Sequence, residues 1–302
     1  MAETITTETR NEKTMNLDEM STHDILHVMN QEDKTVPDAV NNEIKDIEKA
    51  VSAVIDSFKK GGRLIYIGAG TSGRLGILDA VECPPTFGTD PEQVQGLIAG
   101  GENAIMQAVE GAEDDPERAA ADLKALHLSE KDTVIGLAAS GRTPYVIGGL
   151  DYSKATGAHT VSVSCNKNAK SSHHADISIE VDVGPEILTG STRLKAGTAQ
   201  KLVVNMISTS SMIGIGKVYK NLMVDVQLTN KKLIERAKNI ISLAAQVDYD
   251  TAASFLERAH QNPKLAIVMI KLRCSYEKAK QNLAETDGFV REAIKLANKD
   301  GE

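Results

Sequence analysis

The chain has 302 residues, of which 41% are hydrophobic and 25% charged, a composition typical of a globular protein with one large domain and a small additional module. A formal net charge of -8 disfavours nonspecific nucleic-acid binding, and an aromatic share of 3% without any Trp argues against base-stacking surfaces. No apolar run approaches the roughly 20 residues of a membrane span, and the first residues lack a signal-peptide pattern. We therefore expect a cytoplasmic protein that acts on a small molecule, without nucleic-acid or membrane partners.

The first 45 residues are predicted to form an N-terminal helical arm, with a short helix within residues 17–30 and a turn over residues 30–40. An amphipathic helix follows, and Lys59 and Lys60 in its last turn, before Gly61-Gly62, indicate its end. Its apolar face consists of Ile47, Val51, Val54, Ile55 and Phe58.

Short apolar runs then alternate with helical segments, and this alternation predicts an α/β fold with a doubly wound parallel sheet over residues 46–229. The five expected strands are residues 63–68, 94–100, 132–139, 159–165 and 177–183. A long buried helix is expected at residues 198–219. From residue 230 to 302 only helix signals remain, which predicts a small C-terminal all-helical module.

A glycine-rich turn follows the first of these strands, in "LIYIGAGTSGRLGILDAVECPP", where a helix is expected to stop at Glu-Cys-Pro-Pro. Gly68, Gly70 and Gly73 match the dinucleotide fingerprint G-x-G-x-x-G. That fingerprint also needs an acidic residue at the end of the next strand, about 20 residues on. Asp90 and Glu92 have the spacing, but they precede the next strand instead of ending it. The match is therefore weak.

Hydroxyl side chains favour another interpretation, a cradle for the phosphate of a small molecule. Three turns at strand ends or helix starts are rich in Ser, Thr and Gly, and free N–H groups at helix N-termini bind anions. Helix capping by Ser and Thr is the alternative for each turn taken alone. The candidate phosphate-binding residues are Gly70, Thr71, Ser72, Ser140, Gly141, Arg142, Thr143, Ser191, Thr192 and Lys195.

Three cysteines, Cys83, Cys165 and Cys274, are too widely spaced for a metal site or a disulfide framework. Cys83 is a candidate nucleophile beside Glu82, although packing beside a Pro-Pro turn is the simpler interpretation. His173-His174 lacks further ligands at metal-binding spacing, so no metal is expected.

Several longer motifs resemble the sugar isomerase (SIS) domain, a flavodoxin-like phosphosugar-binding fold, and within it the N-acetylmuramic acid 6-phosphate etherase family. The resemblance runs from about residue 15 to near the C-terminus. Its most specific segments are "ECPPT" and "EGAED", supported by "AASGRTPYVIGGL", "GSTRLKAGTAQKLVVNM", "NQEDKTVPDAV" and "GKVYKNLMVDVQLTN". Val81 replaces the small residue that is usual before the glutamate of the first segment.

The resemblance implies a homodimeric lyase of bacterial cell-wall recycling that needs no cofactor. Such an enzyme cleaves the D-lactyl ether of N-acetylmuramic acid 6-phosphate, giving N-acetylglucosamine 6-phosphate and D-lactate. The family's catalytic glutamates match Glu82 and Glu113, which lie 31 residues apart and are expected at neighbouring strand ends. The C-terminal helices resemble a ubiquitin-associated-like module.

Two carboxylic acids suit this chemistry because ring opening creates an aldehyde that acidifies the C2 hydrogen. The resemblance assigns Glu113 as the base at C2 and Glu82 as the acid at the departing lactyl oxygen, before water adds to the unsaturated aldehyde. Glu82 would need a raised pKa, as a partly apolar site provides. Solvated surface positions are the alternative for both residues.

Other roles remain open at this stage. Glu186 is a possible substrate contact or a helix cap, and Lys195 could form a Schiff base or donate to a phosphate or helix end. An aldose–ketose isomerase on the same fold would use one base and release no lactate. A phosphosugar sensor similar to the vertebrate glucokinase regulatory protein would carry two sugar-binding domains, whereas this chain has one set of turns.

Overall fold

The computed structural model of the protein describes residues 5–228 and 230–299. It divides into two compact units. The described residues up to Val81, together with Glu92–Ser208, form the first unit, and Glu82–Pro91, together with the described residues from Thr209 onward, form the second. The predicted boundary at residue 230 takes no account of Glu82–Pro91, which groups with the C-terminal helices.

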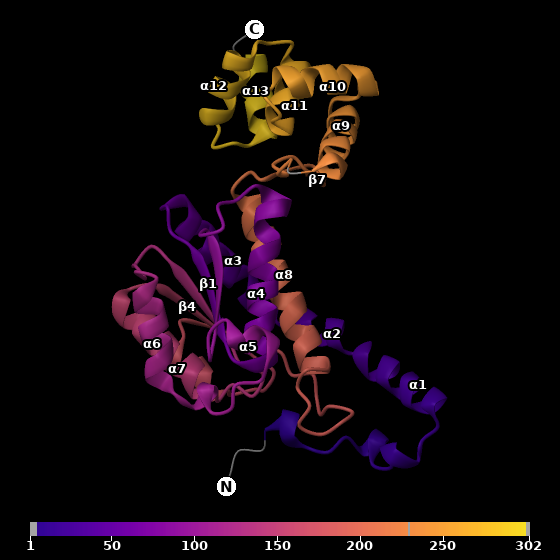
Figure 1. The fold of residues 1–302 in the computed structure, drawn as a ribbon, viewed down its shortest axis with the longest axis vertical. Coiled ribbons are helices and arrows are strands. Elements are labelled where there is room, and N and C mark those ends of the chain that lie inside the picture. The colour runs from indigo at the N-terminus through magenta and orange to yellow at the C-terminus, as the bar shows by residue number, and fades with distance from the viewer. Residues whose placement is uncertain (1–4, 229, 300–302) are drawn as a thin grey trace. The chain divides into compact units, whose positions relative to one another are not determined.

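The first unit is built on a five-stranded parallel sheet in the order β2-β1-β3-β4-β5 (Figure 1). All five strands predicted from the apolar runs are confirmed, each slightly shorter than expected. Their bounds are Leu64–Gly68 (β1), Val94–Ile98 (β2), Thr133–Leu137 (β3), His159–Ser164 (β4) and Ile177–Glu180 (β5). The sequence of β1 and β3 is apolar without alternation because both faces of these central strands are covered.

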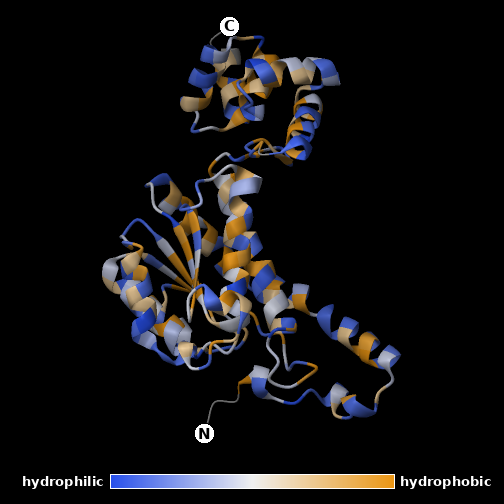
Figure 2. Ribbon diagram, in the orientation of Figure 1, coloured by the Kyte–Doolittle hydropathy of each residue, from blue (hydrophilic) through white to orange (hydrophobic). Residues whose placement is uncertain are grey.

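Helices cover both faces of this sheet, which confirms the doubly wound α/β class. Ile65 and Ile67 of β1 pack with α6 (Pro116–Ala125) and α7 (Pro144–Thr156) on one face. The opposite face carries α3 (Ile44–Lys59), α4 (Gly70–Phe87) and α8 (Lys195–Gly214). Figure 2 shows the strands as the most hydrophobic part of this unit. Three shorter helices lie in its connections: Asn103–Met106 (α5), Ala112–Asp114 (η4) and Lys170–His174 (η5).

One buried acid ties the first residues of the sheet together. Asp132 accepts hydrogen bonds from the Arg63 side chain, at 2.8 Å from Nη2, and from the backbone N–H groups of Arg63 and Ser129. Burial raises the pKa of Asp132, but these hydrogen bonds and the Arg63 charge outweigh burial and hold it below its ordinary value. A charged cluster thus stabilises the end of the sheet at which the strands begin. The carboxyl ends of the strands, at the opposite end, are where a ligand site is expected.

The N-terminal arm is more helical than the sequence predicts. Three short 3-10 helices, Thr6–Glu8 (η1), Glu12–Thr14 (η2) and Leu17–Glu19 (η3), precede α1 (Thr22–Asp33) and α2 (Val36–Asn41). The predicted turn over residues 30–40 is therefore wrong. Pro37 falls in the first turn of α2, where its missing N–H costs no hydrogen bond.

Helix α4 also differs from its prediction, because it continues through Pro84 and Pro85 to Phe87 instead of stopping at them. Helix α8 begins three residues earlier than predicted and ends at Gly214. A short antiparallel hairpin follows α8, with strands Val218–Tyr219 (β6) and Leu222–Met223 (β7), and it was not predicted.

Helices make up the rest of the second unit, as predicted. They are α9 (Lys231–Ala245), α10 (Tyr249–Arg258), α11 (Pro263–Leu272), α12 (Tyr276–Ala284) and α13 (Val290–Lys299), the last of which was not predicted. Residues Leu265–Met269 of α11 are all buried, and they form the centre of a separate hydrophobic core. Within the described part of the chain no helix is long and apolar enough to cross a membrane.

Candidate active site

A cavity of about 190 Å³ lies where β1 and β2 end, next to the point where the strand order reverses between β1 and β3. Ligands of open α/β sheets bind at such a switch point, outside the carboxyl ends of the strands. Both charged groups and small residues face the cavity. Its lining consists of Ala69, Gly70, Arg74, Ala99, Ala104, Gln107, Ala108, Val109, Glu110, Gly111, Ala112 and Glu113.

The glycines of the first turn bring strand and helix backbones into close contact. A Cβ atom at Gly73 would lie 2.6 Å from Cγ1 of Ile98 and 2.8 Å from the carbonyl oxygen of Gly68, too close for any side chain. Gly70 has a φ of +52°, which favours glycine. Helix α4 starts here, so the N–H groups of Gly70, Thr71 and Ser72 have no acceptor within the helix and are available to an anion.

The third hydroxyl-rich turn meets the first one. A Cβ atom at Gly197 would lie 3.5 Å from the carbonyl oxygen of Thr192 and 3.6 Å from Cγ2 of Thr71, so the first turn of α8 reaches the start of α4. Ser72 is buried and donates its hydroxyl proton to Oε1 of Gln200 on α8, at 2.8 Å. In this arrangement the Ser72 oxygen is left as an acceptor.

Gln200 adds a donor that the sequence did not single out. The side chain is 1% exposed, and among the described residues its Nε2 has no hydrogen-bond partner. A buried amide donor without a partner is costly in a folded protein unless a ligand or water accepts from it.

The second turn follows β3, the neighbour of β1, with Leu137 paired to Gly68. Gly141 has a φ of +67°, and a Cβ atom there would lie 2.4 Å from Cβ of Ala169, so this position requires glycine. Ser140 accepts from the N–H of Arg142 at 3.3 Å, and Thr143 precedes α7 without a side-chain capping bond. Capping therefore does not account for the Thr143 hydroxyl.

Glu113 lies in the short helix η4, directly after Gly111, whose φ of +73° turns the chain. Its side chain is exposed and lines the cavity. Glu113 thus stands at the rim of the cavity that Gly70 and Arg74 of α4 also line.

Arg74 is a further cavity residue that the sequence analysis missed. Its Nε donates to the carbonyl oxygen of Ile105 at 2.8 Å, and Nη2 donates to that of Gln107 at 3.1 Å. The guanidinium group therefore fixes the loop that leads to Glu113 while carrying a positive charge along the wall. The sequence signal that could have identified Arg74 is its position directly after Gly73.

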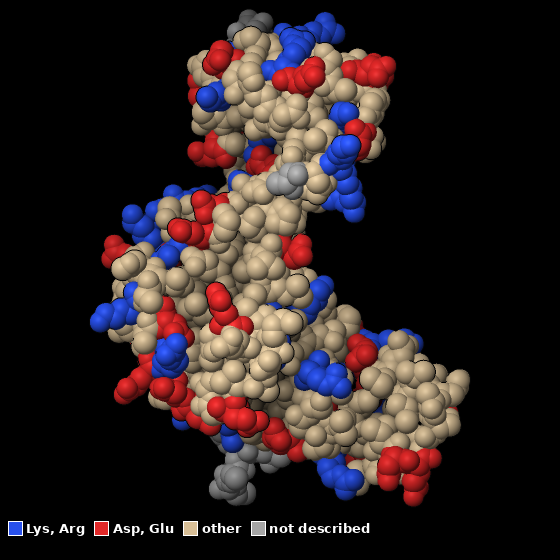
Figure 3. Space-filling view, viewed as in Figure 1, with Lys and Arg blue, Asp and Glu red and all other residues tan. Residues whose placement is uncertain are grey.

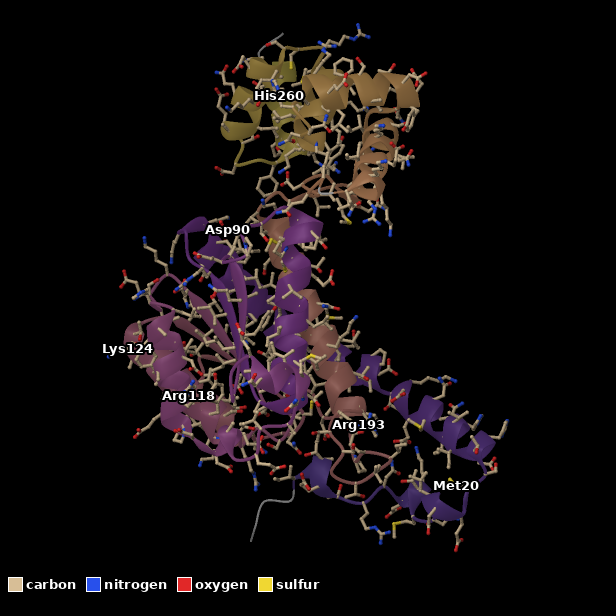
Figure 4. The ribbon with its side chains drawn as sticks, viewed as in Figure 1. Met20, Asp90, Arg118, Lys124, Arg193 and His260 are labelled. Atoms are coloured by element: carbon tan, nitrogen blue, oxygen red, sulfur yellow. The ribbon has the colours of Figure 1, made fainter. Side chains whose placement is uncertain are left out.

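Glu186 and Lys195, two of the candidate residues, are engaged within the protein. Glu186 is fully buried and its two oxygens accept from the N–H groups of Lys195 and Ala196, both at 2.9 Å, so it caps α8. Burial raises the pKa of Glu186 despite these bonds. The Lys195 ammonium donates to Glu32 of α1 at 2.8 Å, so its partner in this structure is a carboxylate of the N-terminal arm. Figure 4 shows Arg193 in the loop just before α8.

Glu82 does not lie at a strand end, and that expectation is wrong. It belongs to α4, twelve residues after Gly70, which corresponds to about 18 Å along the helix axis. Its side chain is exposed, and the spacing of Leu78, Val81 and Glu82 puts these three on one side of α4. Leu78 is 52% and Val81 58% exposed, so Glu82 adjoins an uncovered apolar strip of α4.

The cysteines and the metal candidates are the other groups singled out in the sequence. Cys83 and Cys165 are buried, and burial raises the pKa of the Cys165 thiol far above its ordinary value. Across residues 5–228 and 230–299, His, Cys, Asp and Glu side chains form no group of three or more that could hold a metal ion.

Comparison with known proteins agrees with this geometry. The family model of the SIS domain matches residues 112–210, and that of the glucokinase regulatory protein N-terminal SIS domain matches residues 46–154. A Bacillus cereus protein named N-acetylmuramic acid 6-phosphate etherase is 67% identical over 97% of this chain and 100% of its own length. A Geobacillus protein of the same name is 66% identical with the same coverage. The chain belongs to the N-acetylmuramic acid 6-phosphate etherase family.

For an etherase of this family, the structure assembles part of the predicted site. The turns that contain Thr71 and Thr192 meet, and the Ser140 turn follows the adjacent strand. Glu113 lines the cavity beside them. Arg74 and Gln200 join this set, whereas Glu186 and Lys195 support the start of α8.

Proposed function

We propose that this protein cleaves the D-lactyl ether of N-acetylmuramic acid 6-phosphate, releasing D-lactate and N-acetylglucosamine 6-phosphate. The observation that carries the proposal is the identity of 65–67% to etherases over 97% of the chain. The open N–H groups at the start of α4, beside a cavity lined by the Glu113 carboxylate, support it. We place the reaction in the cytoplasm, in bacterial cell-wall recycling, because a charged phosphate ester does not cross a bilayer unaided.

The two glutamates divide the elimination between them in this proposal. Glu113 removes the C2 proton of the ring-opened sugar, and Glu82 protonates the lactyl oxygen as the C3–O bond breaks. Water then adds to C3 of the unsaturated aldehyde, with Glu82 as base and Glu113 returning a proton to C2. The N–H groups at the start of α4 hold the phosphate, and Arg74 keeps the loop before Glu113 in place.

We further propose that the protein acts as a homodimer in which Glu82 serves the cavity of the partner chain. Helix α4 places Glu82 about 18 Å along its axis from the cradle at Gly70. The cavity of about 190 Å³ is smaller than the roughly 300 Å³ at which ligand pockets usually begin. The exposed Leu78 and Val81 beside Glu82 are apolar side chains that a second copy would bury. The surface over α4 is mainly uncharged in Figure 3.

The reaction is tested by incubating the protein with N-acetylmuramic acid 6-phosphate in deuterated water. We expect lactate release, with deuterium at C2 of the sugar product. Lactate without label at C2 would contradict the elimination route, and label without lactate would indicate an isomerase-type base. No lactate at all would remove the proposed function.

The assignment of the two glutamates is tested with Glu82→Gln and Glu113→Gln. Each should lower kcat at least about 100-fold, the usual contribution of a general acid or base. Glu117→Gln, an exposed carboxylate in the first turn of α6, is the matched control and should keep full activity. Full activity of either of the first two variants would show that its assignment is wrong.

Shared sites are tested by mixing the two inactive variants. A heterodimer of Glu82→Gln and Glu113→Gln chains has one site with both native glutamates, so random exchange of subunits should restore about a quarter of the native activity. Sites built within one chain would give no recovery, because each chain of the mixture lacks one glutamate.

A further inference from the structure

The last turn of α4, which follows Glu82, has fewer backbone hydrogen bonds than an uninterrupted helix. Pro84 and Pro85 lie inside the helix and have no N–H, so the carbonyl groups of Ala80 and Val81 lose their helical donors. An interior proline costs a helix about 3 kcal/mol. The position of the turn that follows Glu82 therefore depends in part on tertiary contacts.

The segment Glu82–Pro91 groups with the C-terminal unit. Phe87 and Thr89 are 6% and 2% exposed, so the segment is packed and not loose. Gly88 has a φ of +62°, and a Cβ atom there would lie 2.2 Å from the carbonyl oxygen of Asp225. The backbone just after α4 thus rests directly on the backbone at Asp225, and Figure 4 labels Asp90 in this same segment.

Asp225 is in turn held by a buried lysine of α11. The ammonium group of Lys264 donates to Oδ2 of Asp225 and, at 2.9 Å, to the carbonyl oxygen of Gly216. Lys264 is 8% exposed, an unusual position for a lysine unless it is paired. Lys217 lies 3.7 Å from the same carboxylate oxygen, and a Cβ at Gly288 would lie 3.5 Å from Nζ of Lys264. One cation therefore joins the hairpin region to the helical module.

From this chain of contacts we infer that the C-terminal helical module positions the catalytic acid. Lys264 holds Asp225, the backbone at Asp225 supports Gly88, and this support fixes the proline-interrupted turn that carries Glu82. Lys264 and Asp225 are positioning residues, since they act through Glu82 and not on the substrate. The inference rests on the proposed role of Glu82.

Loss of this support should affect the acid step and spare phosphosugar binding. The cradle at Gly70 and the base Glu113 both belong to the first unit, whereas Lys264, Asp225 and Glu82 belong to the second. Misplacement of a catalytic group by about 1 Å can cost on the order of 100-fold in rate. A lowered kcat with an unchanged KM is therefore the expected signature.

The test uses Lys264→Met, which keeps the length of the apolar stem, and Asp225→Asn, which keeps the shape of the side chain. We expect lactate release to fall at least about tenfold in kcat in both, with KM within about twofold of the native value. Lys278→Met, an exposed lysine on α12, is the matched control and should behave like the native protein. Far-UV circular dichroism and a thermal melt establish that each variant is folded.

A second measurement distinguishes a positioning role of Lys264 from a global loss of structure. Exchange of the C2 hydrogen of N-acetylglucosamine 6-phosphate in deuterated water needs the base but no departing lactyl group, so it should stay at the native rate in Lys264→Met. Equal loss of exchange and lactate release would overturn the inference in favour of a global structural role. Native lactate release in both variants would overturn it directly.

Combination with Glu82→Gln distinguishes this inference from the function on which it rests. If Lys264 acts through Glu82, Lys264→Met should cause no further loss in the Glu82→Gln background. An additive loss would refute the positioning role while leaving the etherase function intact. A fully active Glu82→Gln variant would instead refute the assignment of the acid, and this inference with it.

Discussion

The two ends of helix α4 are fixed by opposite means. At the amino end, Gly68 and Gly73 let strand and helix backbones touch, and the position of the helix follows from local backbone geometry. At the carboxyl end, Pro84 and Pro85 remove backbone donors, and the position follows from contacts with residues more than a hundred positions away, such as Asp225. The end proposed to bind phosphate is thus locally determined, and the end that carries the proposed acid depends on a separate helical module.

If the proposed roles of the two ends hold, phosphosugar binding and acid catalysis have separate structural supports within one helix. A substitution in the C-terminal helices should lower kcat without changing the affinity for phosphosugar. A substitution in the glycine turn should lower both. Three variants along α4 and its flanks test the comparison.

The largest effect is expected for Gly73→Ala at the amino end. The new methyl group would lie 2.8 Å from the carbonyl oxygen of Gly68, a backbone atom that cannot move aside. We expect a loss of about 1–3 kcal/mol in the free energy of unfolding, together with weaker binding of phosphosugar. Urea denaturation and calorimetric titration with N-acetylglucosamine 6-phosphate measure the two effects.

Gly101→Ala is the control for that variant, because Gly101 has a φ of +70° but nothing within 4 Å of the added atom. It tests whether backbone strain alone produces such a loss. An equal loss of binding in both variants would show that close contact at Gly73 is not what fixes the cradle.

An intermediate effect is expected for Gly88→Ala at the carboxyl end. The added methyl group would collide with the carbonyl oxygen of Asp225 at 2.2 Å and displace the segment after α4. We expect kcat to fall about tenfold or more while KM stays near the native value. Gly61→Ala shares the positive φ, at +74°, but meets nothing within 4 Å, and it should leave kcat unchanged. Steady-state kinetics of both variants is the measurement. A rise in KM without a fall in kcat for Gly88→Ala would contradict the idea that the carboxyl end of α4 affects only the rate.

The smallest effect is expected in the middle of α4, for Asp79→Asn. Asp79 accepts from the Tyr66 hydroxyl at 2.8 Å, from Nδ2 of Asn205 at 2.6 Å and from the Ser208 hydroxyl at 3.0 Å. An asparagine can accept two of these bonds, so the loss of stability at neutral pH should stay near 1 kcal/mol. We expect kcat and KM to remain native, which would show that the effects on binding and on rate arise at the two ends of α4 and not in its middle.

The same variant has a distinct pH signature. Burial raises the pKa of Asp79 above 3.8, although its three donors oppose this. Because the folded state favours the protonated acid, the contribution of Asp79 to stability is present at low pH and is lost as pH rises through the raised pKa. Between about pH 4 and pH 7, the free energy of unfolding of Asp79→Asn should therefore fall less than that of the native protein. Identical slopes in denaturation measured across this range would contradict it.

Local patterns in the sequence predicted much of the fold. Apolar runs between helical segments identified all five strands, because a buried parallel strand must be apolar on both faces. Two predictions based on proline were wrong. Pro37 lies in the first turn of α2, where proline is tolerated, and Pro84-Pro85 lie inside α4, where tertiary contacts tolerate them. The hairpin of β6 and β7 was missed because two-residue strands carry no periodic signal.

The candidate site was predictable where motif residues act through their own backbone, as at Gly70 and Gly141. It was not predictable where partners lie far apart in the chain. The Lys195–Glu32 pair spans 163 residues and the Ser72–Gln200 bond 128, and no spacing rule links such positions. Glu82 lies away from the strand ends because its helix continues past the prolines, a fact of packing and not of propensity.

The N-terminus of helix α8 is capped by a carboxylate of the protein itself. The Glu186 carboxylate occupies the N–H groups of Lys195 and Ala196, where the partial positive charge of a 20-residue helix would otherwise attract a dissolved anion. The first N–H groups of α4 are not capped in this way and stay open. If the phosphosugar binds at the start of α4 as proposed, inorganic phosphate should compete with it there and not at α8, and its inhibition should be competitive.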